Sequence, residues 1–333
     1  HEPLMFLHNL DTTIKEPFAS NPAVLDAVEK NHKKLQIAMT KLYPGNLVLS
    51  LSSGIMYHRL VDRITALNDV PREPLVPRRL GKNMCVPFGK ILRGKVVPNT
   101  VTKTLHTDKV YEPDLDSFTI EPFPYYSPLK SQIETIKSFD RPVILVDDLV
   151  HMANRLQVLV PQLREDGIPI KKVVVGVLSG YGRDLMQCLK VPVESIYSMP
   201  NLRQWFVEST LYPFIGGDTV RREEMKVAGL QPSINMILPY ATPRLSGCSR
   251  EALVEFSACC IENSRDLFQV LEAEYRKMYA KNLTLSRLSE AVILPLCPDK
   301  GSCMEYDENL AASVYLENDL ETLWRMKEFM IKG

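Results

Sequence analysis

Two adjacent carboxylates, Asp147 and Asp148, are the residues of this sequence best suited to bind a ligand. They directly follow Val-Ile-Leu-Val, residues 143–146, a run of four apolar residues that favour a β-strand. Strands covered by helices on both faces have continuous apolar sequences, and ligands of open α/β sheets bind beyond the carboxyl ends of such strands. The pair therefore marks a candidate site. The alternative is that the carboxylates only end the strand in water or cap the next helix.

A second candidate is the short polar turn Ser52-Ser53-Gly54. It follows a strand expected over residues 46–51 and precedes a helix whose apolar residues recur every three or four positions. Backbone N–H groups at the start of such a helix, together with the helix dipole, favour an anion over the turn. The alternative is that these small residues serve only to turn the chain. His58, in the same helix, is expected to be a surface residue rather than a catalytic base.

A basic loop is the third candidate. Residues 71–110 are rich in proline and carry nine Lys or Arg side chains against two acidic ones. Their centre, residues 89–95, places Lys90, Arg93 and Lys95 among glycines, a composition typical of a mobile loop that closes over a phosphate. We expect this loop to be poorly ordered without ligand. An ordinary solvated basic surface is the alternative.

The elements that would position these residues form an α/β pattern. Residues 149–164 are expected to form a helix, kinked or restarted at Pro161. Residues 172–178 and 193–197 have the apolar composition of further strands, and the crossover between parallel strands should be right-handed. Residues 100–106 alternate like an extended arm.

Three consecutive regions are expected from this pattern. They are an N-terminal helical segment over residues 1–45, an α/β domain over residues 46–212, and a mainly helical region over residues 213–333 packed on it. Long helices should begin at Asn21, as an N-cap, and near residues 246–249. Residues 251–330 carry fifteen acidic side chains against eight basic ones, opposite in sign to the basic loop region. This asymmetry allows one part of the chain to dock on another, or one protomer on the next in a homo-oligomer.

Composition excludes several classes of function. The 333-residue chain has 40 basic and 40 acidic side chains, so no net charge attracts nucleic acid or a membrane surface. No apolar run approaches the roughly 18 residues that a membrane span needs, and no signal-peptide pattern is found. Seven cysteines without a C-x-x-C pair indicate reduced thiols and a cytoplasmic location. The chain begins at His1 rather than Met, as expected of a piece of a longer protein.

Other catalytic motifs are absent or incomplete. The sequence around Ser179, Gly-Val-Leu-Ser-Gly, is not a nucleophile elbow, and neither a P-loop nor a G-x-G-x-x-G motif occurs. The six histidines never stand at metal-ligand spacing with cysteines. A phospho-receiver domain would place the acidic pair after its first strand, whereas a strand, a helix and a long loop precede Asp147.

Residues 46–206 resemble the type I phosphoribosyltransferase family. The matching features are a strand ending in Ser-Ser-Gly, a basic flexible loop, and Val-Ile-Leu-Val-Asp-Asp with its helix. The resemblance implies that Ser52, Ser53 and Gly54 bind pyrophosphate and that Lys90, Arg93 and Lys95 close over the reaction. It also implies that Asp147 and Asp148 hold the ribose hydroxyls of phosphoribosyl pyrophosphate, directly or through water on Mg²⁺.

One part of the family pattern differs in this chain. The Thr/Gly-rich loop that wraps the 5′-phosphate corresponds to residues 149–155, which contain no glycine, threonine or serine. Side chains at these positions keep backbone N–H groups from closing around a phosphate. Asn154 and Arg155 are then the residues that can take over phosphate binding, and we expect weak or absent binding of phosphoribosyl pyrophosphate.

The predicted fold is α/β, a phosphoribosyltransferase-like parallel sheet flanked by helices with an additional mainly helical C-terminal region. The first functional hypothesis is a protein that binds a phosphorylated ribose or nucleotide, with Mg²⁺, and has little transferase activity. The second is a non-catalytic nucleotide-sensing or partner-binding module of a larger nucleotidyltransferase-related protein. We expect Asp147 and Asp148 to lie partly exposed in a cleft beside Ser53 and Gly54.

Overall fold

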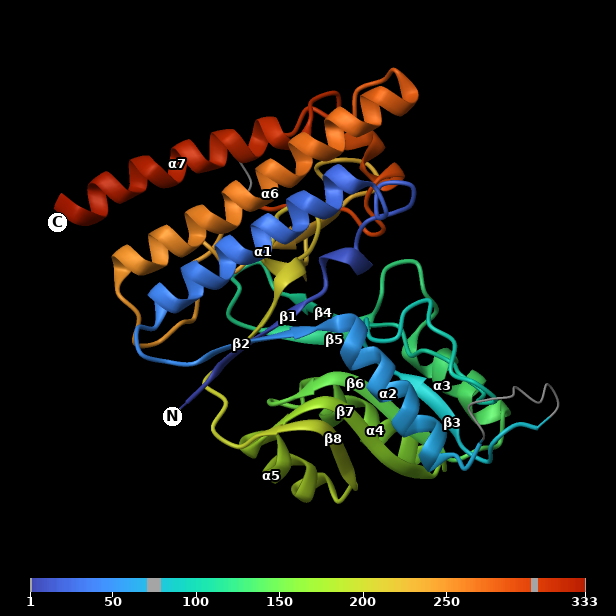
Figure 1. Ribbon diagram of the computed structural model, residues 1–333. Helices are drawn as coiled ribbons and strands as arrows, with labels where there is room; N and C mark the ends of the chain where they lie inside the picture. The colour runs from blue at the N-terminus through green and yellow to red at the C-terminus, as the bar shows by residue number, and fades with distance from the viewer. Residues whose placement is uncertain (1, 71–78, 301–304, 333) are drawn as a thin grey trace. The chain divides into compact units, whose positions relative to one another are not determined.

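The computed structural model describes residues 2–70, 79–300 and 305–332 (Figure 1). The chain divides into two compact units. Unit 1 contains His1–Ser50, Tyr111–Ser117 and Gln204–Gly333, and unit 2 contains Leu51–Val110 and Phe118–Arg203. This division differs from the three consecutive regions expected from the sequence, because the N-terminal and C-terminal segments share one unit.

Unit 2 is built on a four-stranded parallel sheet with the order β3-β6-β7-β8. The strands are β3 (Met84–Pro87), β6 (Val143–Val150), β7 (Ile170–Ser179) and β8 (Val193–Met199). The inner strands β6 and β7 carry the continuous apolar runs that strands need when both faces are covered. The predicted α/β class, with a parallel sheet flanked by helices, is confirmed.

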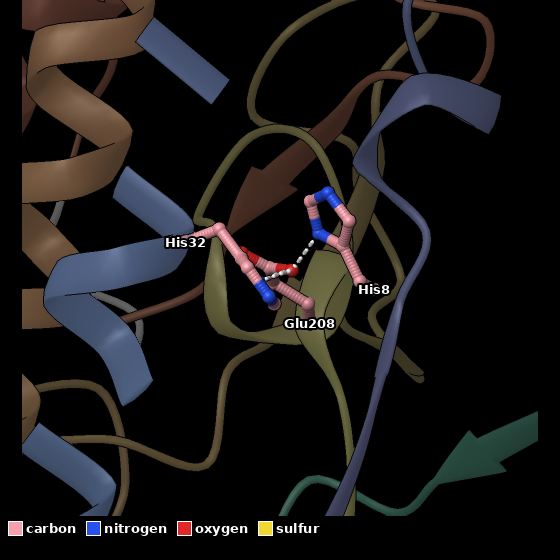
Figure 2. A group of neighbouring side chains, drawn as sticks. All are labelled: His8, His32 and Glu208. Atoms are coloured by element: carbon pink, nitrogen blue, oxygen red, sulfur yellow. Dashed lines mark hydrogen bonds and ion pairs between the residues drawn. The ribbon is translucent and has the colours of Figure 1, made fainter. Parts of the chain in front are cut away.

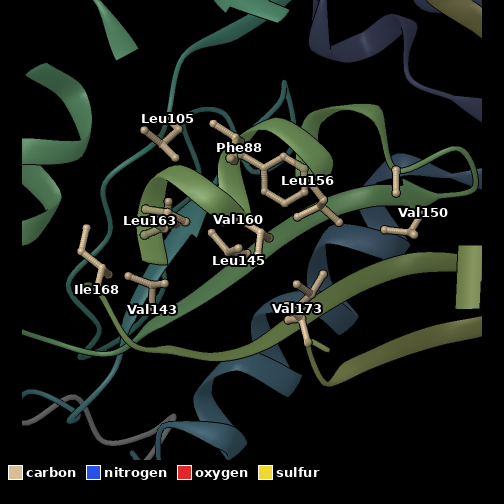
Figure 3. Packing of buried hydrophobic residues seen from close by; sticks show 14 of the residues in the cluster. Phe88, Leu105, Val143, Leu145, Val150, Leu156, Val160, Leu163, Ile168 and Val173 are labelled. Carbon is tan, nitrogen blue, oxygen red and sulfur yellow. The ribbon is translucent and has the colours of Figure 1, made fainter. Parts of the chain in front are cut away.

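Helices cover both faces of this sheet. They are α2 (Ser53–Leu67), α3 (Leu129–Ser138), α4 (Asn154–Glu165) and α5 (Gly180–Leu189). On one face, Leu156 and Val160 of α4 pack in the core with Leu145 of β6 and Val173 of β7 (Figure 3). On the other face, α2 lies so close to β7 that a Cβ at Gly176 would collide with the Met56 side chain. The two layers follow from the alternation of side chains along each strand.

The structure tests the expectations for Pro161 and for the extended arm at residues 100–106. A kink or a restart is predicted at Pro161. The restart is not observed, because α4 is one helix through this residue, and the kink stays a prediction. Because proline has no backbone N–H, the carbonyl of Gln157 lacks its usual hydrogen bond within the helix. Gln157 and Pro161 are both exposed, so a water molecule can donate to this carbonyl instead. The extended arm is confirmed, since Cys85 N donates to the Val101 carbonyl and Lys103 N to the Cys85 carbonyl. Strands β4 (Thr107–Tyr111) and β5 (Phe118–Pro122) follow and are neighbours in a second sheet.

Unit 1 joins strands that are distant in the sequence in one sheet. Strand β1 (Leu4–His8) pairs in parallel with β9 (Gln204–Val207), with Leu4 opposite Gln204 and Leu7 opposite Val207. Strand β2 (Val48–Ser52) lies on the other side of β1. Three further strands are neighbours in the order β12-β11-β10, and they are β10 (Asp218–Val220), β11 (Gln231–Ile234) and β12 (Leu296–Pro298).

Three long helices complete unit 1. Helices α1 (Pro22–Leu42) and α7 (Ala312–Lys332) both pack against α6 (Arg250–Tyr279) (Figure 1). The predicted caps are present, because Asn21 accepts hydrogen bonds from the N–H groups of Ala23 and Val24, and Ser249 accepts one from Ala252. Short 3-10 helices are η1 (Leu10–Thr12), η2 (Glu208–Leu211) and η3 (Leu285–Glu290).

The sequence predicts a chain without membrane spans and with reduced cysteines. Within the described part of the chain, none of the helices combines the length and the apolar character that a membrane span requires. The six cysteines that the structure describes are all free thiols. Cys303, the seventh, lies outside the described residues.

Candidate functional site

The acidic pair lies inside β6 rather than beyond its end. The strand continues through Leu149 to Val150, so its apolar sequence resumes after the two carboxylates. Asp147 is 8% exposed and Asp148 is half-buried. The expectation that both carboxylates end the strand partly in solvent is therefore wrong for Asp147. The N–H of Asp148 donates to Oδ1 of Asp147 at 2.9 Å, which fixes the orientation of the first carboxyl group.

Burial controls the electrostatics of this pair. It raises the pKa of Asp147 well above its ordinary value, and the negative charge of Asp148 raises it further. Burial also raises the pKa of Asp148, although hydrogen bonding to Asp147 and the positive charge of Arg155 act in the opposite direction. One buried and one half-buried carboxyl group with raised pKa values are stabilised by protons, by a cation or by hydroxyl donors. The pair is therefore suited to bind any of these three.

The basic loop begins directly beside this pair. A Cβ built on Gly89 would lie 3.0 Å from Oδ1 of Asp147, so the loop backbone passes close over the carboxyl group. Ile91 and Leu92 are buried at 3% and 4% exposure and anchor the middle of the loop, whereas Lys90, Arg93 and Lys95 are exposed. The position of the loop agrees with a role in covering a ligand. Its expected disorder without ligand stays a prediction.

The segment in place of a phosphate loop leads into α4 without a capping side chain. Ala153 is the N-cap residue with φ +52°, a left-handed conformation that glycine adopts more readily, and no side chain caps the helix here. Asn154 is the first residue of the helix and is half-buried. The first N–H groups of a helix have no partners within it, so this end of α4 can bind an anion.

Arg155 follows in the first turn of α4, as predicted, and acts on the acidic pair. Its positive charge lowers the pKa of both Asp147 and Asp148, which places the guanidinium within electrostatic reach of the two carboxyl groups. Its Nε is buried and has no hydrogen-bond partner among the described residues. A buried guanidinium N–H without an acceptor is unfavourable, so this residue is prepared to bind an anionic group.

The turn at Ser52-Ser53-Gly54 is only partly as predicted. Ser52 is the N-cap residue of α2 and makes no side-chain cap, Ser53 is buried at 1% exposure, and Gly54 is exposed. The strand before the turn, β2, pairs with β1 rather than joining the sheet that contains β6. The expectation that both turns follow strands of one parallel sheet is therefore wrong. The Ser53 side chain does not face solvent.

The residues after β7 lie against the end of β6 and the residue that follows it. Ser179 accepts a hydrogen bond from Gly182 N at 2.9 Å and so caps α5, and its Oγ lies 2.7 Å from Nδ1 of His151. Its 1% exposure agrees with the sequence-based exclusion of a serine nucleophile. Glycine is required at position 182, since a Cβ there would collide with the Val150 carbonyl oxygen. His58 is an exposed residue of α2, as expected.

Comparisons with known proteins find similar structures but no similar sequences. No protein-family model matches the chain, and no curated protein matches it in sequence. Among solved structures, it is similar to a purine phosphoribosyltransferase from Pyrococcus horikoshii Ot3, with 13% identity over 46% of this chain and 85% of that one and a TM-score of 0.28. It is also similar to an adenine phosphoribosyl transferase from Trypanosoma brucei in complex with AMP, pyrophosphate and ribose-5-phosphate, with 10% identity over 59% and 87% and a TM-score of 0.30. At these scores the likenesses carry no argument about activity, which depends on the residues of the site.

Proposed function

We propose that unit 2 binds a phosphorylated ribose or nucleotide at the C-terminal half of β6. The observation that carries this proposal is Arg155. Its buried Nε has no hydrogen-bond partner among the described residues, and its charge acts on two carboxyl groups with raised pKa values. A sugar phosphate combines the two groups that such a site requires. Its hydroxyl groups can donate to Asp147 and Asp148, and its phosphate can accept from the guanidinium of Arg155.

The acidic pair also suits Mg²⁺. Mg²⁺ in phosphate-binding sites is held by one or two carboxylates together with phosphate oxygens and water, and the pair provides two carboxyl groups whose pKa values are raised by burial. Bound there, Mg²⁺ would neutralise phosphate charge, while Asp147 and Asp148 orient the ribose and the basic loop excludes water.

We further propose that transfer of the phosphoribosyl group is weak or absent. Efficient transfer requires a firmly positioned 5′-phosphate. In place of a ring of backbone donors, residues 149–155 offer one guanidinium whose Nε has no hydrogen-bond partner among the described residues. The left-handed Ala153 and the exposed Met152 occupy positions where glycine would let the backbone close. This observation favours the second hypothesis, a nucleotide-sensing or partner-binding module, over an efficient transferase.

Titration calorimetry with phosphoribosyl pyrophosphate, AMP and ribose-5-phosphate, each with and without Mg²⁺, tests binding. Heat is expected for at least one of them, and it should be larger with Mg²⁺. Arg155→Met should weaken binding at least about tenfold, the loss of one charged hydrogen bond. Arg164→Met is the matched control, because Arg164 carries the same charge at the opposite end of α4. No heat from any of the three compounds would refute the proposal, and so would equal effects of the two substitutions.

A further inference from the structure

Unit 1 brings together three side chains of the kinds that bind transition metals. His8 ends β1, His32 lies within α1, and Glu208 begins η2 (Figure 2). Glu208 is 200 residues from His8 and 176 from His32 in the sequence. Each residue offers one ligand atom, and the three atoms lie within 4.8 Å of one another. The acidic pair of unit 2 takes no part in this group.

The three side chains converge on one point. Nδ1 of His32 lies 2.9 Å from Oε2 of Glu208, and Nδ1 of His8 contacts the same oxygen. The two imidazole rings lie with their centroids 3.9 Å apart and their planes at 36° (Figure 2). Both nitrogens therefore face a single carboxylate oxygen from neighbouring positions, an arrangement that a shared cation can occupy.

The fold holds the carboxylate rigidly at this point. Glu208 is completely buried, and η2 is fixed by Asn9, which donates from Nδ2 to Ser209 Oγ and accepts from Ser209 N, both at 3.0 Å. The outer nitrogen of His32 lies 3.1 Å from Ser50 Oγ, which leaves Nδ1 as the atom directed at Glu208. Hydrogen bonds to the outer nitrogen are typical of histidines that bind metals, because they fix the ring and its tautomer.

The protein groups around Glu208 do not fully satisfy it. Both histidines contact Oε2, whereas Oε1 is buried and has no hydrogen-bond partner among the described residues. A buried carboxylate oxygen without a donor costs free energy unless something compensates its charge. Hydrogen bonds from the two imidazoles alone would leave this oxygen unsatisfied. A divalent cation between the three side chains would compensate the charge of the whole carboxylate.

We infer that His8, His32 and Glu208 form a binding site for a divalent transition-metal ion such as Zn²⁺. Two imidazole nitrogens and one carboxylate oxygen are a ligand set that Zn²⁺ accepts at about 2.0–2.2 Å, whereas Mg²⁺ and Ca²⁺ favour sets of oxygen ligands. Tetrahedral bonds of that length separate neighbouring ligand atoms by about 3.3 Å. Nδ1 of His32, which lies 2.9 Å from Oε2 of Glu208, therefore needs to move away from this oxygen by less than about 1 Å.

The site would keep coordination positions for water. The side chains of His8 and His32 are 26% and 14% exposed, whereas Glu208 is not exposed at all. Solvent therefore reaches the ion from the side of the histidines. Three protein ligands and a water molecule are the arrangement of catalytic zinc sites, in contrast to the four protein ligands of structural ones.

The test is binding of Co²⁺ and Zn²⁺ to the whole chain after treatment with a chelator. Co²⁺ in a site of low coordination number gives visible absorption bands, and we expect them to saturate at one equivalent and to disappear on addition of Zn²⁺. His8→Asn and Glu208→Gln should each weaken Zn²⁺ binding at least about 100-fold, as expected for loss of one of three ligands. Variants count only if their circular dichroism matches that of the unmodified chain.

His58→Asn is the matched control. His58 also lies near a carboxylate, with Nε2 4.0 Å from Asp62 Oδ2, but its side chain is 64% exposed and no second imidazole adjoins it. Its substitution should leave Zn²⁺ affinity unchanged. X-ray absorption at the zinc edge of the unmodified chain provides a measurement that needs no variant, and it should show nitrogen and oxygen neighbours only. Absence of Co²⁺ bands, unchanged affinity in a folded His8→Asn variant, or sulfur neighbours at about 2.3 Å would each overturn the inference.

Discussion

Glu272 on α6 makes the stability of unit 1 depend on pH. Burial raises the pKa of its carboxyl group from 4.5 to about 7, although the hydroxyl of Ser313 on α7 donates a hydrogen bond to it. Between these two values the folded state binds more protons than the unfolded state, so stability falls as pH rises from about 4.5 through 7. Glu272→Gln removes this dependence and keeps an acceptor for Ser313.

The pKa shift of Glu272 sets how much the free energy of unfolding changes with pH. A difference of about 2.5 pKa units at about 1.36 kcal/mol each gives an upper limit of about 3.4 kcal/mol above pH 8. Glu272 is only half-buried, so solvent screening should reduce the gain of the glutamine variant to about 1–2 kcal/mol at pH 8. At pH 5 the gain should be less than about 0.5 kcal/mol, because both forms of the folded chain are then mostly uncharged at this position.

Urea unfolding followed by tryptophan fluorescence measures this difference. The two tryptophans of the chain, Trp205 and Trp324, both lie in unit 1, so their fluorescence reports on the unit that contains Glu272. Glu255→Gln on the same helix is the control, since its side chain is 54% exposed. Equal gains at pH 5 and pH 8 for Glu272→Gln would refute the reasoning from burial.

Three other predictions concern unit 2. Asp148→Asn should lower the affinity for phosphoribosyl pyrophosphate with Mg²⁺ at least about tenfold in calorimetry, and unchanged affinity would contradict a role of this carboxylate. Replacing residues 152–155 by Thr-Gly-Gly-Thr should raise the affinity for phosphoribosyl pyrophosphate about tenfold, because several backbone donors replace one guanidinium. A loss of binding would instead identify Arg155 as the principal phosphate ligand. Leu163→Ala should destabilise unit 2 by about 2–5 kcal/mol in urea unfolding followed by circular dichroism, since this side chain is fully buried in the core; a loss below about 1 kcal/mol would contradict the packing.

The elements of unit 2 could be predicted from the sequence because its inner strands are covered on both faces. Continuous apolar runs and Gly or Ser at the turns identify β6, β7 and the helices after them. The end of β6 was placed too early, at the acidic pair. Leu149 and Val150 are apolar and continue the strand, so they were the signal that Asp147 and Asp148 lie within it.

Pairing between distant segments could not be predicted in the same way. Apolar composition identifies residues 46–51 as a strand but does not say which strand lies beside it, and β2 pairs with β1. The three candidate metal ligands are a similar case, because no local spacing connects His8 and His32 with Glu208. Only the pairing of β1 with β9 brings the ends of these strands, and so His8 and Glu208, side by side.

The pairing of β1 with β9 also affects how the chain folds during synthesis. Leu4 pairs with Gln204, a separation of 204 − 4 = 200 residues, and unit 2 is inserted between them. A ribosome adding about 5–20 residues per second completes β1 roughly 10 to 40 s before β9. During this time the apolar strand β1, Leu-Met-Phe-Leu-His, has no β9 to pair with. Unit 2, in contrast, has all four strands of its parallel sheet once Met199 has been added. During synthesis, β1 thus exposes an unpaired apolar strand edge until β9 has been made.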